Sequence, residues 1–268
     1  MIHKCYTYYS LRGDYPLNEV VDLFSNVEIG NVWAKGTKKN YGDDLYSDSN
    51  VQTKKYEDMG GLAQGQFDLL MDTLREKENS IICLKKEHPI STCFEIVPTL
   101  TNHRGMQIII PHELLRFCHA TDSKIDIDYY VCDNSKYQLT NYCCSKLILN
   151  GEVNNEAIMT DVFKEGNSEK LDHTKEYGTL PRLILGCKQG DVINTSVLQT
   201  QTVKFIQPYV EDIKSMILKH IITAVFVIEV QVVNQMSRPL VSPTKALIEF
   251  CNYTGADLSI MINTNYPS

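Results

Sequence analysis

FCHATDSKIDIDYY, at residues 117–130, returns near the C-terminal end as FCNYTGADLSIMIN, at residues 250–263. Phe, Cys, Thr and one Ile recur between the two stretches at a constant separation of 133 residues. In each stretch, apolar residues at helical spacing lead into a segment in which apolar and polar residues alternate, as in a strand. The repetition predicts a duplicated domain whose copies both end in a helix followed by a strand.

Length and composition agree with a duplication. The chain has 268 residues, 43% hydrophobic and 22% charged, which is enough for two domains of about 130 residues each. We expect a first repeat at residues 1–133, a linker at 134–140 and a second, divergent repeat at 141–268. The opening residues show no basic region followed by an apolar run, and no apolar run approaches the ~18 residues of a membrane span. These features predict a soluble, cytoplasmic protein that does not interact with membranes.

Nine cysteines are scattered along the chain without a Cys-x-x-Cys pair or a histidine at zinc-binding spacing. Several lie within apolar periodic segments. We expect them to be reduced thiols that pack as small hydrophobic residues, with no metal bound.

The first copy is expected to alternate strands and helices. Residues 5–11 alternate as a strand, and Pro16 suits the first turn of a helix. Residues 40–61, rich in Asp, Asn, Ser and Gly, predict a long loop or a poorly formed hairpin. The other elements expected are a strand at 27–34, a helix at 67–84, strands at 91–100 and 106–110, a helix containing Leu114, Leu115 and Phe117, and a closing strand at 124–131.

The second copy is expected to follow the same order. A strand at 143–149 and Gly151 repeat the first strand and Gly13. A helix at 206–221 should match the helix at Phe67, and residues 228–230 should match 94–96. Residues 180–198 predict a hairpin. The predicted fold is α+β, with two tandem ferredoxin-like or split β-α-β sandwiches, related by a pseudo-two-fold axis, that each carry helices on one side of a mainly antiparallel sheet.

The first copy contains RGDYPLNEVVDLF, at residues 12–24, and NVWAKGTK, at residues 31–38. Over residues 5–131 it resembles family 4279 of the bacterial domains of unknown function, whose members carry Gly-Asp, a proline at a helix start and Trp-x-Lys-Gly. Those features are here Gly13, Asp14, Pro16, Trp33 and the pair Lys35-Gly36. The second copy keeps Gly151 and an acidic residue but no tryptophan. The resemblance implies no activity, catalytic residue or cofactor. By analogy with other small bacterial families, it suggests an immunity protein of a toxin–antitoxin or other conflict system.

Two pairs of residues on neighbouring strands form a candidate partner-binding surface. Asp126 and Asp128, at i and i+2, should project from one strand face about 7 Å apart. Tyr6 and Tyr8 should share that face if the first strand neighbours the closing one. Tyr and Asp together suit a protein contact, since Tyr offers a large contact area at low entropic cost. The alternatives are a solvated strand face, burial of the tyrosines between the copies, and a divalent cation held by the aspartates.

Trp33 and the nearby Lys35, Lys38 and Lys39 form an alternative, ligand-binding group of residues. An indole ring with cations beside it could stack on and neutralise a nucleotide. The other interpretation is a structural tryptophan beside a solvated loop. The Gly60-Gly61 segment lacks the Lys-Ser/Thr of a phosphate-binding loop.

Charge and motifs together favour a binding protein over an enzyme. Residues 1–134 hold 14 Lys and Arg against 20 Asp and Glu, whereas residues 135–268 hold 12 against 13. An acidic chain without a basic patch excludes nucleic acid as the expected partner and favours a basic protein such as a toxin. No catalytic or cofactor motif is present. The main hypothesis is a non-enzymatic protein that inhibits a toxin, with a binder of nucleotide signals and an unrecognised enzyme as alternatives.

Overall fold

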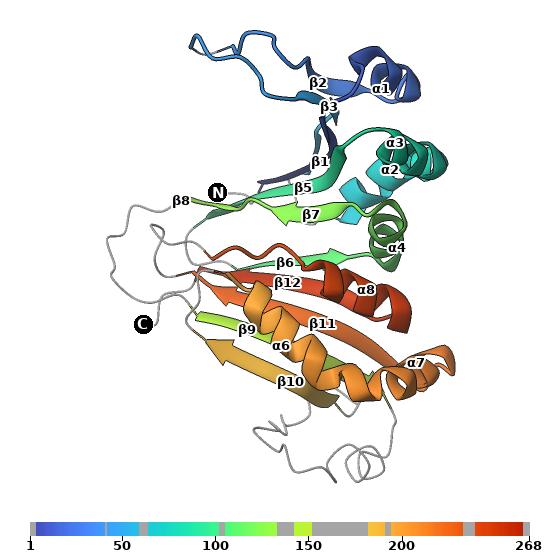
Figure 1. Cartoon of the computed structure of the whole chain (residues 1–268). Helices are drawn as coiled ribbons and strands as arrows, with labels where there is room; N and C mark the ends of the chain where they lie inside the picture. The colour runs from blue at the N-terminus through green and yellow to red at the C-terminus, as the bar shows by residue number, and fades with distance from the viewer. Residues whose placement is uncertain are drawn as a thin grey trace. The chain divides into compact units, whose positions relative to one another are not determined.

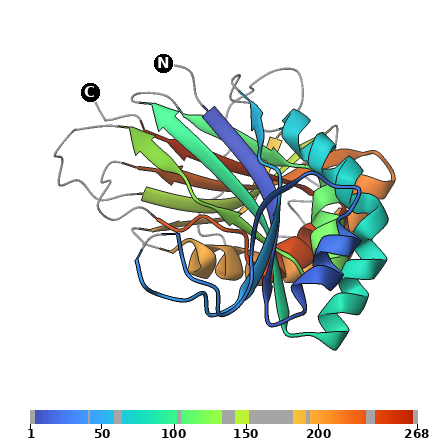
Figure 2. The same cartoon turned by 90° about the horizontal axis from the view of Figure 1, so that it is seen from above.

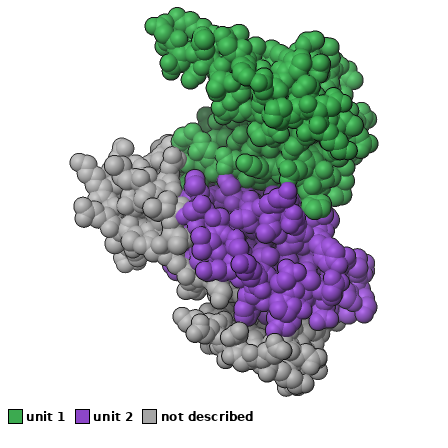
Figure 3. Space-filling model, in the orientation of Figure 1, with its two compact units in different colours: residues 1–101, 116–132 green, residues 102–115, 133–268 purple. Residues whose placement is uncertain are grey.

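The computed structural model describes residues 4–40, 42–58, 64–101, 105–132, 142–151, 182–190, 194–232 and 239–264. The chain divides into two compact units, Met1–Thr101 with Arg116–Cys132 and Asn102–Leu115 with Asp133–Ser268 (Figure 3). Each is α+β with a mixed sheet. No helix in the described ranges is long and apolar enough to cross a membrane. The predicted linker, residues 134–140, lies outside the described residues.

Unit 1 is built on a seven-stranded sheet with the order β2-β3-β1-β5-β7, in which β4 also pairs with β1 and β8 with β5. Its strands are β1 (Lys4–Gly13), β2 (Ile29–Trp33), β3 (Ser49–Thr53), β4 (Tyr56–Asp58), β5 (Ile90–Thr101), β7 (Lys124–Ile127) and β8 (Tyr130–Cys132). Its helices are α1 (Leu17–Leu23), α2 (Gln64–Leu74), α3 (Glu78–Glu87), the 3-10 helix η1 (Arg75–Lys77) and part of α4 (His112–Thr121). Figures 1 and 2 both place α1, α2 and α3 on one side of these strands.

Alternation along β1 explains how the core of unit 1 forms. Cys5, Thr7, Tyr9 and Leu11 are buried, and the residues between them are more exposed as far as Tyr8. Tyr9 meets Phe94 of β5 and Phe117 of α4, with ring centroids 4.8 and 5.9 Å apart. These rings occupy the side of the sheet on which the helices pack, so the other side is left for polar residues.

Unit 2 is built on a five-stranded sheet with the order β10-β9-β11-β12-β6. Its strands are β6 (Met106–Ile110), β9 (Tyr142–Gly151), β10 (Arg182–Gly190), β11 (Ile222–Gln231) and β12 (Asp257–Asn263). Its helices are α6 (Ser196–Ile206), α7 (Val210–Leu218), α8 (Lys245–Thr254) and the 3-10 helix η2 (Gln207–Tyr209). Thr244 caps the start of α8 by accepting a hydrogen bond from the Leu247 amide, and Gly255 ends the helix in a left-handed conformation.

One strand from the first half of the chain belongs to the sheet of unit 2. β6 pairs antiparallel with β12, with Ile108 opposite Ile260. It buries Met106, Ile108 and Ile110 and exposes Ile109, which is the alternation of a strand with one face in a core. The units therefore differ from the predicted repeats at residues 102–115, which group with the second half of the chain.

The two sheets share an order of equivalent strands. β3-β1-β5-β7 in unit 1 corresponds to β10-β9-β11-β12 in unit 2. In both units an 11-residue helix, a three-residue 3-10 turn and a second helix follow one another, with α2 and α6 starting 132 residues apart. Tyr9 lies opposite Phe94, as Leu147 lies opposite Phe226. The expected match of residues 228–230 to 94–96 is therefore wrong by two residues, since Phe226 is the equivalent of Phe94.

The repeated FC stretches occupy equivalent places in α4 and α8. Thr121 and Thr254, near the ends of these helices, each donate a hydrogen bond to the carbonyl of the Phe four residues earlier, at 2.7 and 2.9 Å. The next residue has a positive φ in both, 50° at Asp122 and 82° at Gly255. Each helix is then followed by a strand that runs parallel to its neighbour, β7 beside β5 and β12 beside β11.

Four expectations from the sequence are corrected. The sheets are mixed, because a helical crossover lets the strand that follows α4 or α8 run parallel to the preceding one. The expected loop at 40–61 contains β3 and β4, both hydrogen-bonded to β1. Of the hairpin expected at 180–198, β10 is one strand, and Ser196 already begins α6. The helix expected at 206–221 is α7, and α6 ends where it was expected to begin.

The cysteines of the described ranges carry free thiols. Five of them, Cys5, Cys118, Cys143, Cys144 and Cys251, are buried, and burial raises the pKa of the Cys118 and Cys251 thiols. Cys83 is exposed and Cys93 half-buried. Packing as small apolar side chains therefore accounts for most of the cysteines that the structure describes.

Candidate functional site

The side of the unit 1 sheet that faces away from α1, α2 and α3 carries acidic and aromatic side chains. We call it the acidic face and define it by Tyr6, Tyr8, Glu95, Asp126 and Asp128. These residues alternate with buried neighbours on β1, β5 and β7, for example Tyr9, Phe94 and Ile125. Because neighbouring side chains of a strand point to opposite sides, burial of the second set directs the first set away from the helices.

Strand register brings three of these residues into one row. Tyr8 lies opposite Glu95 in the antiparallel pair of β1 and β5. Glu95 in turn lies opposite Asp126 in the parallel pair of β5 and β7. Directly paired residues on one face have neighbouring side chains. Two carboxylates and a phenol are thus neighbours across three strands.

The row is electrostatically unfavourable for anions. Burial raises the pKa of Glu95, and the nearby Asp126 carboxylate raises it further, while Cys93 and the Ser10 hydroxyl act in the opposite direction. Burial likewise raises the pKa of Tyr8, followed by the charge of Glu95. Ser10 donates a long hydrogen bond of 3.4 Å to Glu95 Oε1. Among the described residues, no lysine or arginine forms an ion pair with Glu95.

A lysine of the loop between β3 and β4 lies over the two tyrosines. Tyr6 and Tyr8 stack with ring centroids 6.2 Å apart and planes at 20°. Lys55 Nζ lies 4.4 Å from the Tyr6 centroid and 5.7 Å from that of Tyr8. Both distances are within the range of a cation–π interaction. The tyrosine pair therefore already holds one cationic group of the chain itself.

Asp128 lies at the exposed end of the row. The expected closing strand at 124–131 is interrupted, since β7 ends at Ile127 and β8 begins at Tyr130. The Asp128 amide still donates to the Ile96 carbonyl at 3.0 Å, so the alternation continues and Tyr129 is buried. Asp128 Oδ2 accepts a hydrogen bond of 2.8 Å from the Tyr130 hydroxyl. No three His, Cys, Asp or Glu side chains in the described ranges are arranged to hold a metal ion.

The structure thus places Tyr6, Tyr8, Asp126 and Asp128 on one face, and it adds residues that sequence reasoning missed. Glu95 joins the row, and Lys55 and Tyr130 contact its members. The signal for Glu95 was present in the sequence, because it lies between Phe94 and Ile96 in a strand of alternating pattern. Lys55 gave no such signal, since its loop was expected to lack strands.

The equivalent face of unit 2 has a different chemical character. Lys146 and Val227 replace Tyr8 and Glu95, and the fully buried Ser259 replaces Asp126. Lys146 forms an ion pair of 3.1 Å with Glu229 on the neighbouring strand. The acidic face therefore belongs to unit 1 alone, although the underlying strand order is shared.

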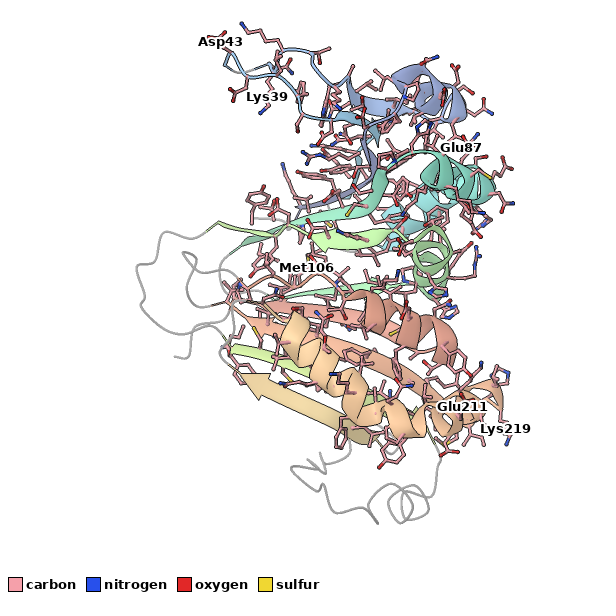
Figure 4. All side chains as sticks on the ribbon, viewed as in Figure 1. Lys39, Asp43, Glu87, Met106, Glu211 and Lys219 are labelled. Carbon is pink, nitrogen blue, oxygen red and sulfur yellow. The ribbon has the colours of Figure 1, made fainter. Side chains whose placement is uncertain are left out.

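The second predicted site, around Trp33, lies at the base of a hairpin arm, residues 34–48, between β2 and β3. The arm is a hydrogen-bonded hairpin, in which the Gly36 amide donates to the Tyr46 carbonyl at 2.8 Å and the Tyr46 amide to the Thr37 carbonyl at 2.9 Å. Trp33 stacks on Tyr46 with centroids 4.9 Å apart and planes at 19°. Figure 4 labels Lys39 and Asp43 at the far end of the arm.

The lysines expected to attract an anion are all ion-paired. Lys35 pairs with Asp14, Lys38 with Asp43 at 2.6 Å, and Lys39 with Asp44 at 3.9 Å. The contact between Lys35 and Asp14 also joins two separate parts of the motif on which the family resemblance rests. Three carboxylates offset three ammonium groups, so the arm lacks the excess positive charge that binding of a phosphate group would need.

The two candidate sites therefore offer different chemistry. The acidic face can accept hydrogen bonds from cationic groups and stack against them, whereas the base of the arm offers aromatic rings with paired charges. Comparison of the chain with known protein families, with curated proteins and with solved structures yields no match.

Proposed function

We propose that the chain is a non-enzymatic binding protein that holds a basic segment of a protein partner on its acidic face. The observation that carries the proposal is the row of Tyr8, Glu95 and Asp126 beside Asp128. The pKa of Glu95 is raised, so its ionised form is under-stabilised in the isolated protein. A cationic side chain of a partner would relieve that repulsion and accept the exposed carboxylate of Asp128 as a second contact.

The position of Lys55 supports the same chemistry. Its ammonium group lies over the Tyr6 and Tyr8 rings in the unbound protein. A partner arginine can use the same aromatic surface, because its planar guanidinium stacks on rings and also forms paired hydrogen bonds with carboxylates. Tyr and Arg are the residue types that contribute most to many protein interfaces.

The proposed partner class is a basic protein, such as a bacterial toxin that this chain inhibits as its immunity protein. The acidity of the first half of the chain favours attraction of such a partner over distance, and complementary charge increases association rates. The family resemblance of the first copy is compatible with a conflict system and carries no activity of its own.

We further propose that the architecture is a tandem duplication of a split β-α-β unit in which only one copy has kept or gained a binding face. The shared order of four strands and the equivalent helix pairs support the duplication. The ferredoxin-like description applies to the β5-α4-β7 and β11-α8-β12 segments, whose outer strands run parallel.

Charge reversal tests the proposed function. The tagged protein and an Asp126→Lys/Asp128→Lys variant are used to capture partners from the native host, and affinity for the captured protein is then measured with purified components. We expect the variant to weaken that complex by at least a hundredfold, since each reversal replaces attraction by repulsion. Affinity should also fall as salt concentration rises.

The matched control reverses two exposed carboxylates on the opposite layer of unit 1. Asp68 and Asp72 lie four residues apart on α2, and an Asp68→Lys/Asp72→Lys variant has the same change in net charge. It should keep most of the affinity. Equal loss in both variants would indicate a general charge effect, and unchanged binding by the Asp126/Asp128 variant would exclude the acidic face as the binding surface.

A further inference from the structure

The base of the hairpin arm contains a groove that the proposed protein contact does not use. It has a volume of about 550 Å³, within the range of roughly 300–1,000 Å³ typical of small-molecule sites. Its lining comes from the start of α1, from β2 and from both sides of the arm. The residues that matter for recognition are Asn31, Trp33, Thr37, Asn40 and Tyr46.

The charge of the groove excludes the phosphate-binding role that the lysines had suggested. Lys38 is the lysine that lines the groove, and it pairs with Asp43. Lys35 and Lys39, which are not part of the lining, pair with Asp14 and Asp44. A ligand that relied on anionic groups would have to compete with these carboxylates, so the groove favours an uncharged ligand.

The aromatic residues of the lining favour a planar ligand. The Trp33 and Tyr46 rings are nearly parallel, at 19°, and both line the groove. Leu17, Val32 and Ala34 add apolar wall. Stacking on such rings is favourable for any flat π-system, and each stacked nucleobase contributes on the order of 1–3 kcal/mol in nucleic-acid-binding proteins.

Polar groups of the lining favour a heterocycle over a plain hydrocarbon ring. Asn31 donates to Gln52 Oε1 at 3.0 Å, which leaves its own amide oxygen as an acceptor toward other groups. Asn40 and the Thr37 hydroxyl add donors and acceptors. The Trp33 Nε1–H group is buried and has no hydrogen-bond acceptor among the described residues. A ligand acceptor that satisfied this group would remove the cost of an unpaired buried donor.

We propose that the groove binds the uncharged planar ring of a nucleoside-class ligand, with the ring stacked on the Trp33–Tyr46 pair and its polar edge directed to the amide and hydroxyl groups. The site is separate in residues from the acidic face, so it does not depend on the proposed protein contact. The ligand class is defined by its base and ribose, and phosphate groups contribute nothing to the affinity.

Trp33, the single tryptophan of the chain, makes the site directly observable. The full chain is titrated with adenosine, guanosine, cytidine and uridine while indole fluorescence is excited at its red edge, where nucleosides absorb little. At least one nucleoside is expected to change the emission saturably, with a dissociation constant on the order of 0.1 mM. The 5′-monophosphate and triphosphate of that nucleoside should bind within about twofold of it at low and high salt. Absence of a saturable response to all four nucleosides overturns the proposal.

Variants separate stacking from charge, with binding followed by equilibrium dialysis of the labelled nucleoside. Tyr46→Leu should weaken binding about tenfold, the loss expected for one stacking partner. Lys38→Met should leave binding unchanged, as should the matched control Tyr253→Leu at an exposed tyrosine of α8. Each variant is first compared with the wild type by circular dichroism and thermal unfolding. Affinity that rises with phosphate number and collapses in Lys38→Met would overturn the uncharged class and assign an anion site instead.

Discussion

The ammonium group of Lys85 donates a hydrogen bond of 2.6 Å to the main-chain carbonyl of Asp122. It also donates to the Thr121 carbonyl at 2.9 Å, so one side chain of α3 binds both carbonyls at the end of α4. Asp122 has a positive φ of 50°, which is uncommon for a residue with a side chain. The equivalent position of unit 2 is Gly255, which adopts the same conformation without such help. The copies therefore end the same helix by different means.

Lys85→Met should destabilise the protein by about 1–3 kcal/mol, because two helix-end carbonyls lose their donor. Urea-induced unfolding followed by circular dichroism measures the change. Lys86→Met, at the neighbouring exposed lysine, is the control and should change the free energy of unfolding by less than about 0.5 kcal/mol. Equal effects of the two substitutions would remove any special role of Lys85 at this helix end.

Glu95→Gln should stabilise the protein at pH 7 by roughly 1 kcal/mol, because it removes the repulsion from Asp126 and keeps an acceptor for Ser10. The pKa of Glu95 is raised in the folded state above its ordinary value of 4.5, so the folded state gains a proton first as the pH falls. The penalty from this carboxylate is therefore present at neutral pH and is lost as the pH falls through the folded pKa toward 4.5.

Unfolding curves for the wild type and Glu95→Gln at pH 7 and at pH values approaching 4.5 test this sign. The stability difference should shrink as the pH falls. Glu57→Gln, at an exposed position on β4, serves as a matched carboxylate-to-amide control. A difference that grows on acidification, or a destabilised Glu95→Gln variant at pH 7, would contradict the assigned electrostatics.

Gly13→Ala and Gly151→Ala should each destabilise the protein by about 2–4 kcal/mol. A Cβ atom at Gly13 would lie 2.3 Å from the Pro89 carbonyl oxygen, and one at Gly151 would lie 2.4 Å from that of Ile221. Both contacts are with backbone, which cannot move aside without disturbing the strand pair. Thermal unfolding should show a similar loss for both, since the positions are equivalent.

Gly65→Ala provides the control for this pair. Gly65 lies in the first turn of α2 with open space around it, so alanine should be neutral or stabilise by up to about 1 kcal/mol through its higher helix propensity. A loss at Gly13 without a loss at Gly151 would indicate that the two turns, despite their shared glycine, are not under the same constraint.

Local patterns accounted for much of the fold. The strand β6 coincides with the predicted residues 106–110, and β5 with 91–100 to within one residue at each end. Strand partners were harder to predict, because alternation along a strand states which side is buried and says nothing of its neighbour. The parallel pairing of β5 with β7, and of β11 with β12, therefore escaped the sequence reading.

The candidate sites show the same division. Alternation placed Tyr6, Tyr8, Asp126 and Asp128 on outward-facing positions, and it could have included Glu95. The pairing of Lys35 with Asp14, across 21 residues, could not be foreseen from composition, because the folded hairpin arm brings the two together. This pairing changes the chemistry expected at Trp33 from anion binding to stacking on an uncharged ring.

The sequence by itself determined the duplication, since the FC stretches and the glycines of the first turns recur in register, and each repeated residue answers a local constraint of helix end or strand turn. Only the tertiary structure decided that β6 joins the sheet of unit 2 and that Glu95 stands between Tyr8 and Asp126. Both outcomes depend on which strands pair. Pairing is set by contacts between residues far apart in the chain, so it is not contained in any local pattern.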